Sequence, residues 1–205
     1  MGVALRLGLS LCVAHDCHCG SRVDEWGTHA MVCKRAPGRI SRHHAVNEII
    51  ARSFTSAGIP VAKEPAGLLR SDGRRPDGLT LVPWRGGKPL AWDATISSTL
   101  AESYLDASSV GAASAAEGAA ARKVAKYTGL PAEYSFQPVA LETLGPVSSA
   151  TAEFIDELGQ RISERSGEPR EAGFLWQRLS VCIQRFNAIL LFQSFVCLAE
   201  AEPDE

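Results

Sequence analysis

The apolar positions of this chain change period along its length, and the changes delimit a series of helices and strands. Apolar residues recur every three or four positions between 42 and 57, as on one face of a helix, and again between 174 and 186, whereas the run that starts at 90 is short and continuous. The predicted elements are a helix at 42–57, strands at 59–64, 75–83 and 89–96, a helix at 100–128 that Gly111 could interrupt, a strand at 134–142, and helices at 149–166 and 171–199. This α-β-β-β-α-β order with further helices predicts an α/β fold in which helices flank a mixed sheet.

The first predicted helix has recognisable ends and two distinct sides. Ser41 suits its N-cap and Gly58 its C′ position. At ~100° per residue, His43 and Asn47 fall at the edge of the apolar stripe, where a helical side chain can face a cleft with the sheet. His43 is therefore either a phosphate-binding or active-site residue or an ordinary histidine at the boundary of the core.

The charged residues are distributed unevenly along the chain, which the small net charge conceals. The chain has 205 residues, 45% of them hydrophobic, and a formal charge of −2, which suits one domain of ordinary size plus a small appendage. Residues 1–92 carry 13 Lys and Arg against 7 Asp and Glu, whereas residues 93–205 carry 8 against 16. We expect the basic half to face nucleic acid, with Arg42 aided by the positive end of its helix. The expected contacts come from Arg39, Arg42, Arg74 and Arg75.

No segment has the pattern of an export signal or a membrane span. The apolar start carries Arg6 in its middle and lacks a basic leader with a clean cleavage site, and the apolar stretch at 188–198 is too short to cross a bilayer. We therefore expect an intracellular protein without a membrane partner. Its six cysteines then argue for metal binding or buried thiols rather than disulfides.

Two aspartates at the strands are the main candidates for chemistry. Asp77 follows Arg74-Arg75-Pro76, and Asp93 lies within an apolar run where an unpaired carboxylate would be costly. The turn-forming segment 83–89 would join the two strands as a hairpin, so the carboxylates could meet and hold Mg²⁺ or Mn²⁺, with help from the carbonyl of Ala94. The competing interpretation makes Asp77 a turn residue before Gly78.

A positive charge for such a site has to come from elsewhere in the chain, because Thr95 stands where a lysine would normally follow the second carboxylate. The predicted helix that follows carries Lys123, Lys126 and Tyr127. Either lysine could reach the carboxylates if this helix packs over the strands, or both could belong to a solvated helix end. We favour Lys123, because it lies four residues before Tyr127 and so shares a helix face with an aromatic ring.

A cluster of cysteine and histidine near the start has the spacing of a zinc site. Cys17, Cys19, His29 and Cys33 supply four N or S donors, the number that a structural Zn²⁺ needs. The Cys-x-Cys pair is tighter than the common spacing, so His15 or His18 could replace one of the four. The other interpretation is a set of incidental thiols in a flexible segment.

Together these features resemble the restriction-like endonuclease domain, of PD-(D/E)XK type, at the C-terminus of site-specific non-LTR retrotransposon polyproteins. The shared features, in chain order, are the knuckle of Cys17, Cys19, His29 and Cys33, the pair Arg42-His43, Pro76-Asp77, Asp93 with Thr95, and a helix ending in Lys123, Lys126 and Tyr127. The resemblance implies a restriction-endonuclease-like fold and a nick in target DNA that primes reverse transcription. It also implies RNA and a reverse transcriptase encoded elsewhere as partners, and a nuclear location.

The leading hypothesis is a Mg²⁺-dependent DNA endonuclease with a structural zinc knuckle. We expect a knuckle segment at 1–36, a nuclease domain at 37–200 and an acidic tail at 201–205. Asp77 and Asp93 would hold the metal, and a helix lysine would act on the attacking water or the developing charge. One rival is a catalytically inactive nucleic-acid-binding module in which the acidic pair is a relic, and another is a purely structural or interaction protein.

Overall fold

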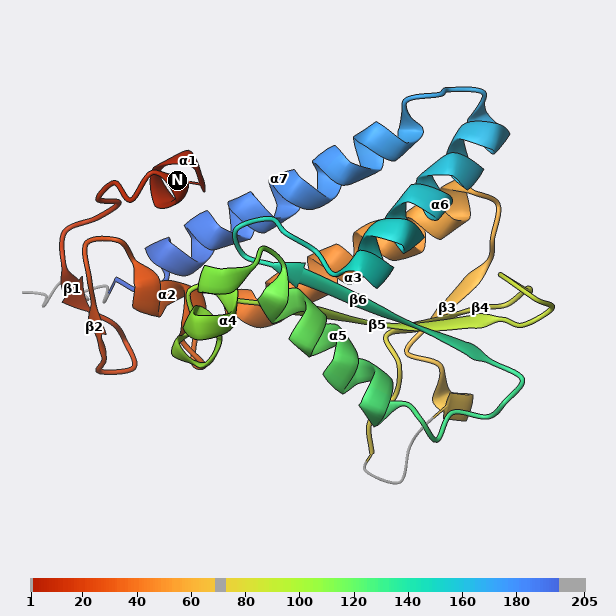
Figure 1. Ribbon diagram of the computed structural model, residues 1–205, viewed down its shortest axis with the longest axis horizontal. Helices are drawn as coiled ribbons and strands as arrows, with labels where there is room; N and C mark the ends of the chain where they lie inside the picture. The colour runs from red at the N-terminus through yellow and green to blue at the C-terminus, as the bar shows by residue number, and fades with distance from the viewer. Residues whose placement is uncertain (1, 69–72, 196–205) are drawn as a thin grey trace, which may run out of the picture.

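The computed structural model describes residues 2–68 and 73–195 (Figure 1). The helices and strands are α1 (Gly2–Arg6), β1 (His15–Asp16), β2 (Arg22–Val23), α2 (Thr28–Val32), α3 (Gly38–Ser56), β3 (Val61–Lys63), η1 (Ala66–Leu68), β4 (Gly78–Thr80), β5 (Leu90–Ser97), η2 (Glu102–Tyr104), α4 (Leu105–Val110), α5 (Ser114–Lys126), β6 (Ser135–Glu142), α6 (Ser149–Ser166) and α7 (Glu171–Phe192).

The main sheet has the strand order β3-β4-β5-β6 in the part of the chain that the structure describes. The strands β3, β4 and β5 are antiparallel neighbours, whereas β6 runs parallel to β5, from Leu90 opposite Ser135 to Ser97 opposite Glu142. The predicted α/β fold with a mixed sheet is therefore confirmed. Pro138 lies within β6, which is tolerated because β6 is an edge strand.

Helices cover the two faces of the sheet unequally. The helices α3, α6 and α7 pack together on one face, and α5 crosses the other (Figure 1). The larger face encloses the main core, in which Phe54 of α3, Trp92 of β5 and Phe154 of α6 are in contact and almost fully buried. The apolar stripe predicted for the first helix is the side of α3 that enters this core.

Small side chains bring α5 close to the sheet. Ala116, Ala119 and Ala120 pack directly on Ala140 of β6. Because alanine adds only one carbon beyond the backbone, this helix approaches the strands closely enough for the lysines at its end to reach β5.

Several predicted boundaries were wrong. The strand expected at 75–83 is only Gly78–Thr80, and the helix expected at 100–128 is broken into η2, α4 and α5 around Gly111. The first helix begins at Gly38, so Ser41 lies inside it rather than at its N-cap, although Gly58 has the predicted left-handed conformation with φ of 77°. The last predicted helix ends at Phe192, and its expected continuation beyond residue 195, like the acidic tail, lies outside the described residues.

The N-terminal segment lies at one end of the molecule, beside the C-terminal end of α7 (Figure 1). Its buried residues, among them Cys17, Cys33 and Met31, form a small second core together with Leu190 and Leu191 of α7. This segment is therefore attached to the sheet domain through α7. No helix in the described ranges is long and apolar enough to cross a membrane.

Candidate functional site

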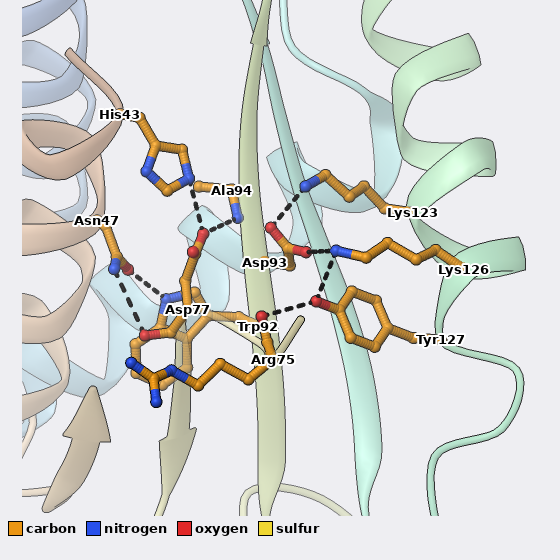
Figure 2. A network of polar contacts seen from close by, with 10 residues as sticks. All are labelled: His43, Asn47, Arg75, Asp77, Trp92, Asp93, Ala94, Lys123, Lys126 and Tyr127. Carbon is orange, nitrogen blue, oxygen red and sulfur yellow. Dashed lines mark hydrogen bonds and ion pairs between the residues drawn. The ribbon is translucent and has the colours of Figure 1, made fainter. Parts of the chain in front are cut away.

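The two aspartates meet beside the hairpin that joins β4 to β5 (Figure 2). Asp77 immediately precedes β4, and its backbone N–H donates to the carbonyl of Trp92 at 2.9 Å. Because Trp92 precedes Asp93 in β5, this hydrogen bond fixes Asp77 beside Asp93 across the strand pair. The two carboxylates thus come together as the hairpin predicts, although Asp77 lies just outside its strand.

A histidine lies close to both carboxylates and contacts one of them, Asp77. His43 Nε2 on α3 lies 3.0 Å from Asp77 Oδ2, and ligand atoms of His43, Asp77 and Asp93 all lie within 4.8 Å of one another. The hydrogen bond to Asp77 raises the pKa of His43, and this effect outweighs the opposing effect of burial. The spacing and the donor types mean that this cluster could bind a metal ion.

Asp77 is also held by backbone and amide groups. The N–H of Ala94 donates to Asp77 Oδ2 at 2.6 Å, so the structure places Ala94 at the site through its amide, and a role for its carbonyl stays a prediction. Asn47 Nδ2 donates to the Asp77 carbonyl at 3.5 Å, and Asn47 Oδ1 accepts from Trp92 Nε1 at 2.7 Å. The position of Asp77 is therefore coupled to the buried indole of Trp92.

Gly78 is required by this packing rather than by a turn. A Cβ at Gly78 would lie 2.0 Å from the Trp92 ring, which no side chain could tolerate without moving the ring. Asp77 itself occupies a bend directly before β4, and Gly78, which begins that strand, leaves room for the indole.

Two lysines converge on the carboxylate of Asp93 from α5 (Figure 2). Lys123 Nζ lies 2.6 Å from Asp93 Oδ1, and Lys126 Nζ lies 3.1 Å from Oδ2. Burial acts to raise the pKa of Asp93, but the charge and hydrogen bond of Lys123 and the smaller effects of Tyr127 and Lys126 outweigh it, and the pKa is lowered. Asp93 is therefore ionised at neutral pH, and the positive charge that Thr95 cannot supply comes from both lysines.

Tyr127 is placed differently from the expectation. The Lys126 ammonium lies 2.9 Å from the Tyr127 hydroxyl and 4.5 Å from the centre of its ring, and the hydroxyl donates to the Arg75 carbonyl at 2.9 Å. The Tyr127 ring thus lies against the ammonium of Lys126, and the preference for Lys123, argued from a face shared with Tyr127, stays a prediction.

Glu142 anchors the lysine helix, and the sequence analysis did not identify it. Its carboxylate is buried, with the residue only 1% exposed, and accepts from the N–H of Ala116 in the first turn of α5 at 3.0 Å and from Thr99 Oγ1 at 2.8 Å. A carboxylate at a helix N-terminus satisfies an otherwise unpaired donor and the helix dipole. The only sequence signal was an acidic residue at the end of an apolar strand.

The four predicted zinc ligands lie together in the N-terminal segment. Cys17 and Cys33 have their Sγ atoms 3.8 Å apart, and Cys19 Sγ lies 3.1 Å from His29 Nε2. Sulfur ligands ~2.3 Å from a tetrahedral zinc are about 3.8 Å apart, so the Cys17–Cys33 spacing matches a zinc site. All four ligand atoms lie within 4.8 Å of one another, and this cluster could bind zinc.

The histidines considered as substitutes have other partners. His15 Nε2 lies 2.8 Å from Ser194 Oγ and stacks on Phe195, while His18 Nδ1 lies 3.0 Å from the Gln193 carbonyl. These contacts tie the segment to the residues that follow α7, and the group that could bind a metal contains the four predicted residues and neither of these histidines. Among the described residues Cys12 and Cys182 are free thiols, and Cys197 lies outside them.

Two thiols of the cluster have opposite protonation preferences. Burial raises the pKa of Cys17 to about 11, whereas hydrogen bonds from Ser21 lower the pKa of Cys19 to about 6. Cys19 is thus largely a thiolate at neutral pH, and a metal bound here would have to displace a proton from Cys17.

We expect the purified protein to contain roughly one zinc per chain, and Cys33→Ser to lose it, because three donors hold zinc far more weakly than four. Elemental analysis checks the metal content. NMR spectra should show the N-terminal segment loosened and the sheet unchanged. Cys12→Ser is the matched control, since this thiol lies in the same segment but outside the cluster, and it should retain the zinc. Wild-type protein free of metal with an ordered N-terminal segment would contradict the assignment.

The four arginines expected to contact nucleic acid have different environments. Arg39, Arg74 and Arg75 are all exposed, and Arg75 forms an ion pair with Glu64. Arg42 is buried and only 2% exposed, because α3 begins four residues earlier than predicted and Arg42 lies in its second turn against Asn187 of α7. The expectation that Arg42 lies at the helix start was therefore wrong.

A basic hollow lies beside the carboxylates. Its volume is about 600 Å³, and of the described residues that line it none is acidic. Seven of these lining residues are Lys or Arg: Lys34, Arg39, Arg42, Arg74, Arg122, Lys123 and Lys126. An adjoining hollow of about 570 Å³ shares Arg42 and Lys123 with it and is also lined by His43 and Ala94. The positive surface therefore continues to the carboxylate pair.

Comparison with known proteins adds no further constraint. A scan against protein-family models and a search of the curated proteins found no match to this chain.

Proposed function

We propose that this chain is a divalent-metal-dependent endonuclease that hydrolyses phosphodiester bonds in DNA. The observation that carries the proposal is the convergence of Asp77, Asp93 and His43 with two lysine ammoniums, directly beside a hollow lined by cations. Carboxylates that bind a cation next to ammoniums that stabilise anionic oxygens are the groups that phosphodiester hydrolysis requires.

The roles of the residues follow from their contacts. Asp77 and Asp93 would hold Mg²⁺ or Mn²⁺, which when bound supplies Lewis-acid chemistry at a phosphate oxygen and promotes ionisation of a water. His43 orients Asp77 and, in its protonated form, adds positive charge beside the phosphate. Lys123 and Lys126 hold Asp93 ionised, and either ammonium could turn to the attacking water or a phosphate oxygen.

The proposed type of nuclease and its biological role rest on the resemblance to the retrotransposon endonuclease domain. In this proposal the strand order and α5 form a restriction-endonuclease-like core, and the knuckle holds a structural Zn²⁺. The nick in DNA would prime a reverse transcriptase encoded elsewhere on an RNA template, and the protein would act in the nucleus.

One observation favours a second candidate, a catalytically inactive nucleic-acid-binding module. Both oxygens of Asp93 are already paired with lysines, so the acidic site is electrostatically satisfied by the protein alone. In an inactive descendant of a nuclease such a network could persist as a structural element.

Cleavage of supercoiled plasmid DNA separates the two candidates. With added Mg²⁺ or Mn²⁺ the nuclease should convert it to the nicked circle, and without the added ion it should not. Leaving out the ion, rather than adding a chelator, keeps the zinc in place. The absence of cleavage of supercoiled, linear and single-stranded DNA with either ion would favour the binding module.

We expect DNA binding to weaken steeply with salt, whichever candidate is correct. Each phosphate contact contributes a slope of about −0.9 in a plot of log affinity against log salt concentration. Arg39→Gln should reduce the slope by about one contact, because its exposed side chain lines the basic hollow, and Arg75→Gln should reduce it less, because Glu64 already pairs with it. Fluorescence anisotropy with a labelled duplex measures the slopes.

Arg178→Gln is the matched control for this series. Arg178 lies on α7 and pairs with Glu171, and the slope of this variant should equal that of the wild type. An affinity that does not depend on salt would contradict the assignment of the basic hollow to nucleic acid and favour an interaction protein.

A further inference from the structure

Arg42 is a buried cation that lacks an anionic partner in the described part of the chain. The residue is 2% exposed, its Nη1 lies 3.4 Å from Asn187 Oδ1, and its buried Nε has no hydrogen-bond partner within residues 2–68 and 73–195. Among the described residues no carboxylate lies within ion-pair distance of it. Because a charge removed from water is costly unless it is paired and hydrogen-bonded, this arrangement is unusual for a group with a purely structural role.

A second unsatisfied donor lies on the same hollow. Ser98 follows β5 and is 8% exposed, and its buried hydroxyl has no hydrogen-bond partner among the described residues. Arg42 and Ser98 both line the hollow of about 600 Å³, and the exposed Lys34 and Arg39 line it as well. Two buried donors that no described acceptor satisfies, with further cations lining the same hollow, have the chemistry of an anion site.

We propose that Arg42 and Ser98 form a binding site for a backbone phosphate of the nucleic acid, distinct from the phosphate that is cleaved. The planar guanidinium donates to two oxygens of one phosphate, and a serine hydroxyl donates to a third acceptor position. The adjoining hollow shares Arg42 with this site and reaches His43 and Ala94, so a strand held here would continue toward Asp77 and Asp93. This site deepens the proposed nuclease function by fixing the strand relative to the carboxylates.

The same donors could accept free inorganic phosphate, so the experiment has to distinguish the two sources. The affinity of a labelled DNA duplex is measured by anisotropy as a function of salt, without added Mg²⁺, so that cleavage does not enter. Thermal unfolding is measured in parallel with and without inorganic phosphate. The variants are Arg42→Met, Arg42→Lys and Ser98→Ala, with Arg52→Met as the control, because Arg52 lies exposed on the same helix and pairs with Glu48.

Arg42→Met should weaken duplex binding roughly tenfold and reduce the salt slope by about one contact, because it removes one charged phosphate contact. Arg42→Lys should retain the slope but bind more weakly than the wild type, because an ammonium lacks the paired donors. Ser98→Ala should weaken binding without changing the slope, since the hydroxyl is neutral. Without DNA, Arg42→Met should unfold at the wild-type temperature or higher, because an apolar side chain of similar size replaces an unpaired buried charge.

An unchanged duplex affinity and slope in Arg42→Met would overturn the proposal. If Arg42→Met both binds more weakly and unfolds at a lower temperature, Ser98→Ala decides, because removing an unbonded hydroxyl does not disturb the fold. Weaker binding by Ser98→Ala then supports the site, and wild-type binding overturns it.

Stabilisation by inorganic phosphate that requires Arg42, with duplex binding that does not, would assign the pocket to a free anion and also overturn the proposal. A protein without nuclease activity can still give the supporting result, so the two proposals fail separately.

Discussion

Replacing either carboxylate at the hairpin should abolish metal-dependent cleavage while leaving most of the DNA affinity. Asp77→Asn and Asp93→Asn keep the shape of the side chain but remove the charge that, in the proposed mechanism, would hold the cation. A lost metal ion removes several kcal/mol of transition-state stabilisation, so we expect a fall in rate of ~10³-fold or more, equivalent to ~4 kcal/mol. Single-turnover cleavage of a labelled duplex with added Mg²⁺ measures this effect.

The two variants should differ in stability. Asp93→Asn leaves the ammoniums of Lys123 and Lys126 close together without a counter-charge, so its unfolding temperature should fall further than that of Asp77→Asn. Asp106→Asn is the control for both, because Asp106 is an exposed residue on α4, and it should cleave at the wild-type rate. Cleavage that survives both changes, in protein shown to be folded, would mean that the carboxylate pair is not the catalytic centre.

Local sequence patterns predicted the parts of this site that depend on neighbouring segments. The turn between two strands was enough to bring Asp77 beside Asp93, since a hairpin fixes its own register. The spacing of Cys17, Cys19, His29 and Cys33 was enough to find the thiol and imidazole cluster, because all four ligands come from one short segment.

The features that the sequence did not predict depend on distant contacts. Glu142 meets the start of α5 only because β6 pairs in parallel with β5, a register that no local pattern specifies. Arg42 is buried because α7 packs along α3, with Asn187 145 positions away in the chain. The break before α5 places Ala113 in the left-handed region with φ of 66°, although alanine is the strongest helix former, so tertiary packing overrides local preference there.

The two lysines of α5 allow a sharper test of mechanism than the carboxylates do. Lys126 is held by three groups, the Asp93 carboxylate, the Tyr127 hydroxyl and the Tyr127 ring. Lys123 lines both hollows beside the site, whereas Lys126 lines only the larger of them. Lys123 is therefore the better candidate to turn from Asp93 to the attacking water or to a phosphate oxygen, for a reason independent of Tyr127.

We expect Lys123→Met to lower the single-turnover rate by ~10²-fold or more, equivalent to ~2.7 kcal/mol or more of transition-state stabilisation. Lys126→Met should mainly weaken DNA binding and change the rate by less. The Mg²⁺ concentration for half-maximal rate should fall in Lys123→Met. In the unsubstituted protein the Lys123 ammonium lies 2.6 Å from Asp93 Oδ1 and would compete with a cation for that oxygen. A lower rate together with a lower Mg²⁺ requirement distinguishes a catalytic ammonium from one that only supports the carboxylate. Lys88→Met, in the exposed hairpin turn, is the control and should match the wild type in both quantities. Equal losses from the two α5 variants, together with a raised Mg²⁺ requirement, would instead mean that both lysines serve only to position Asp93.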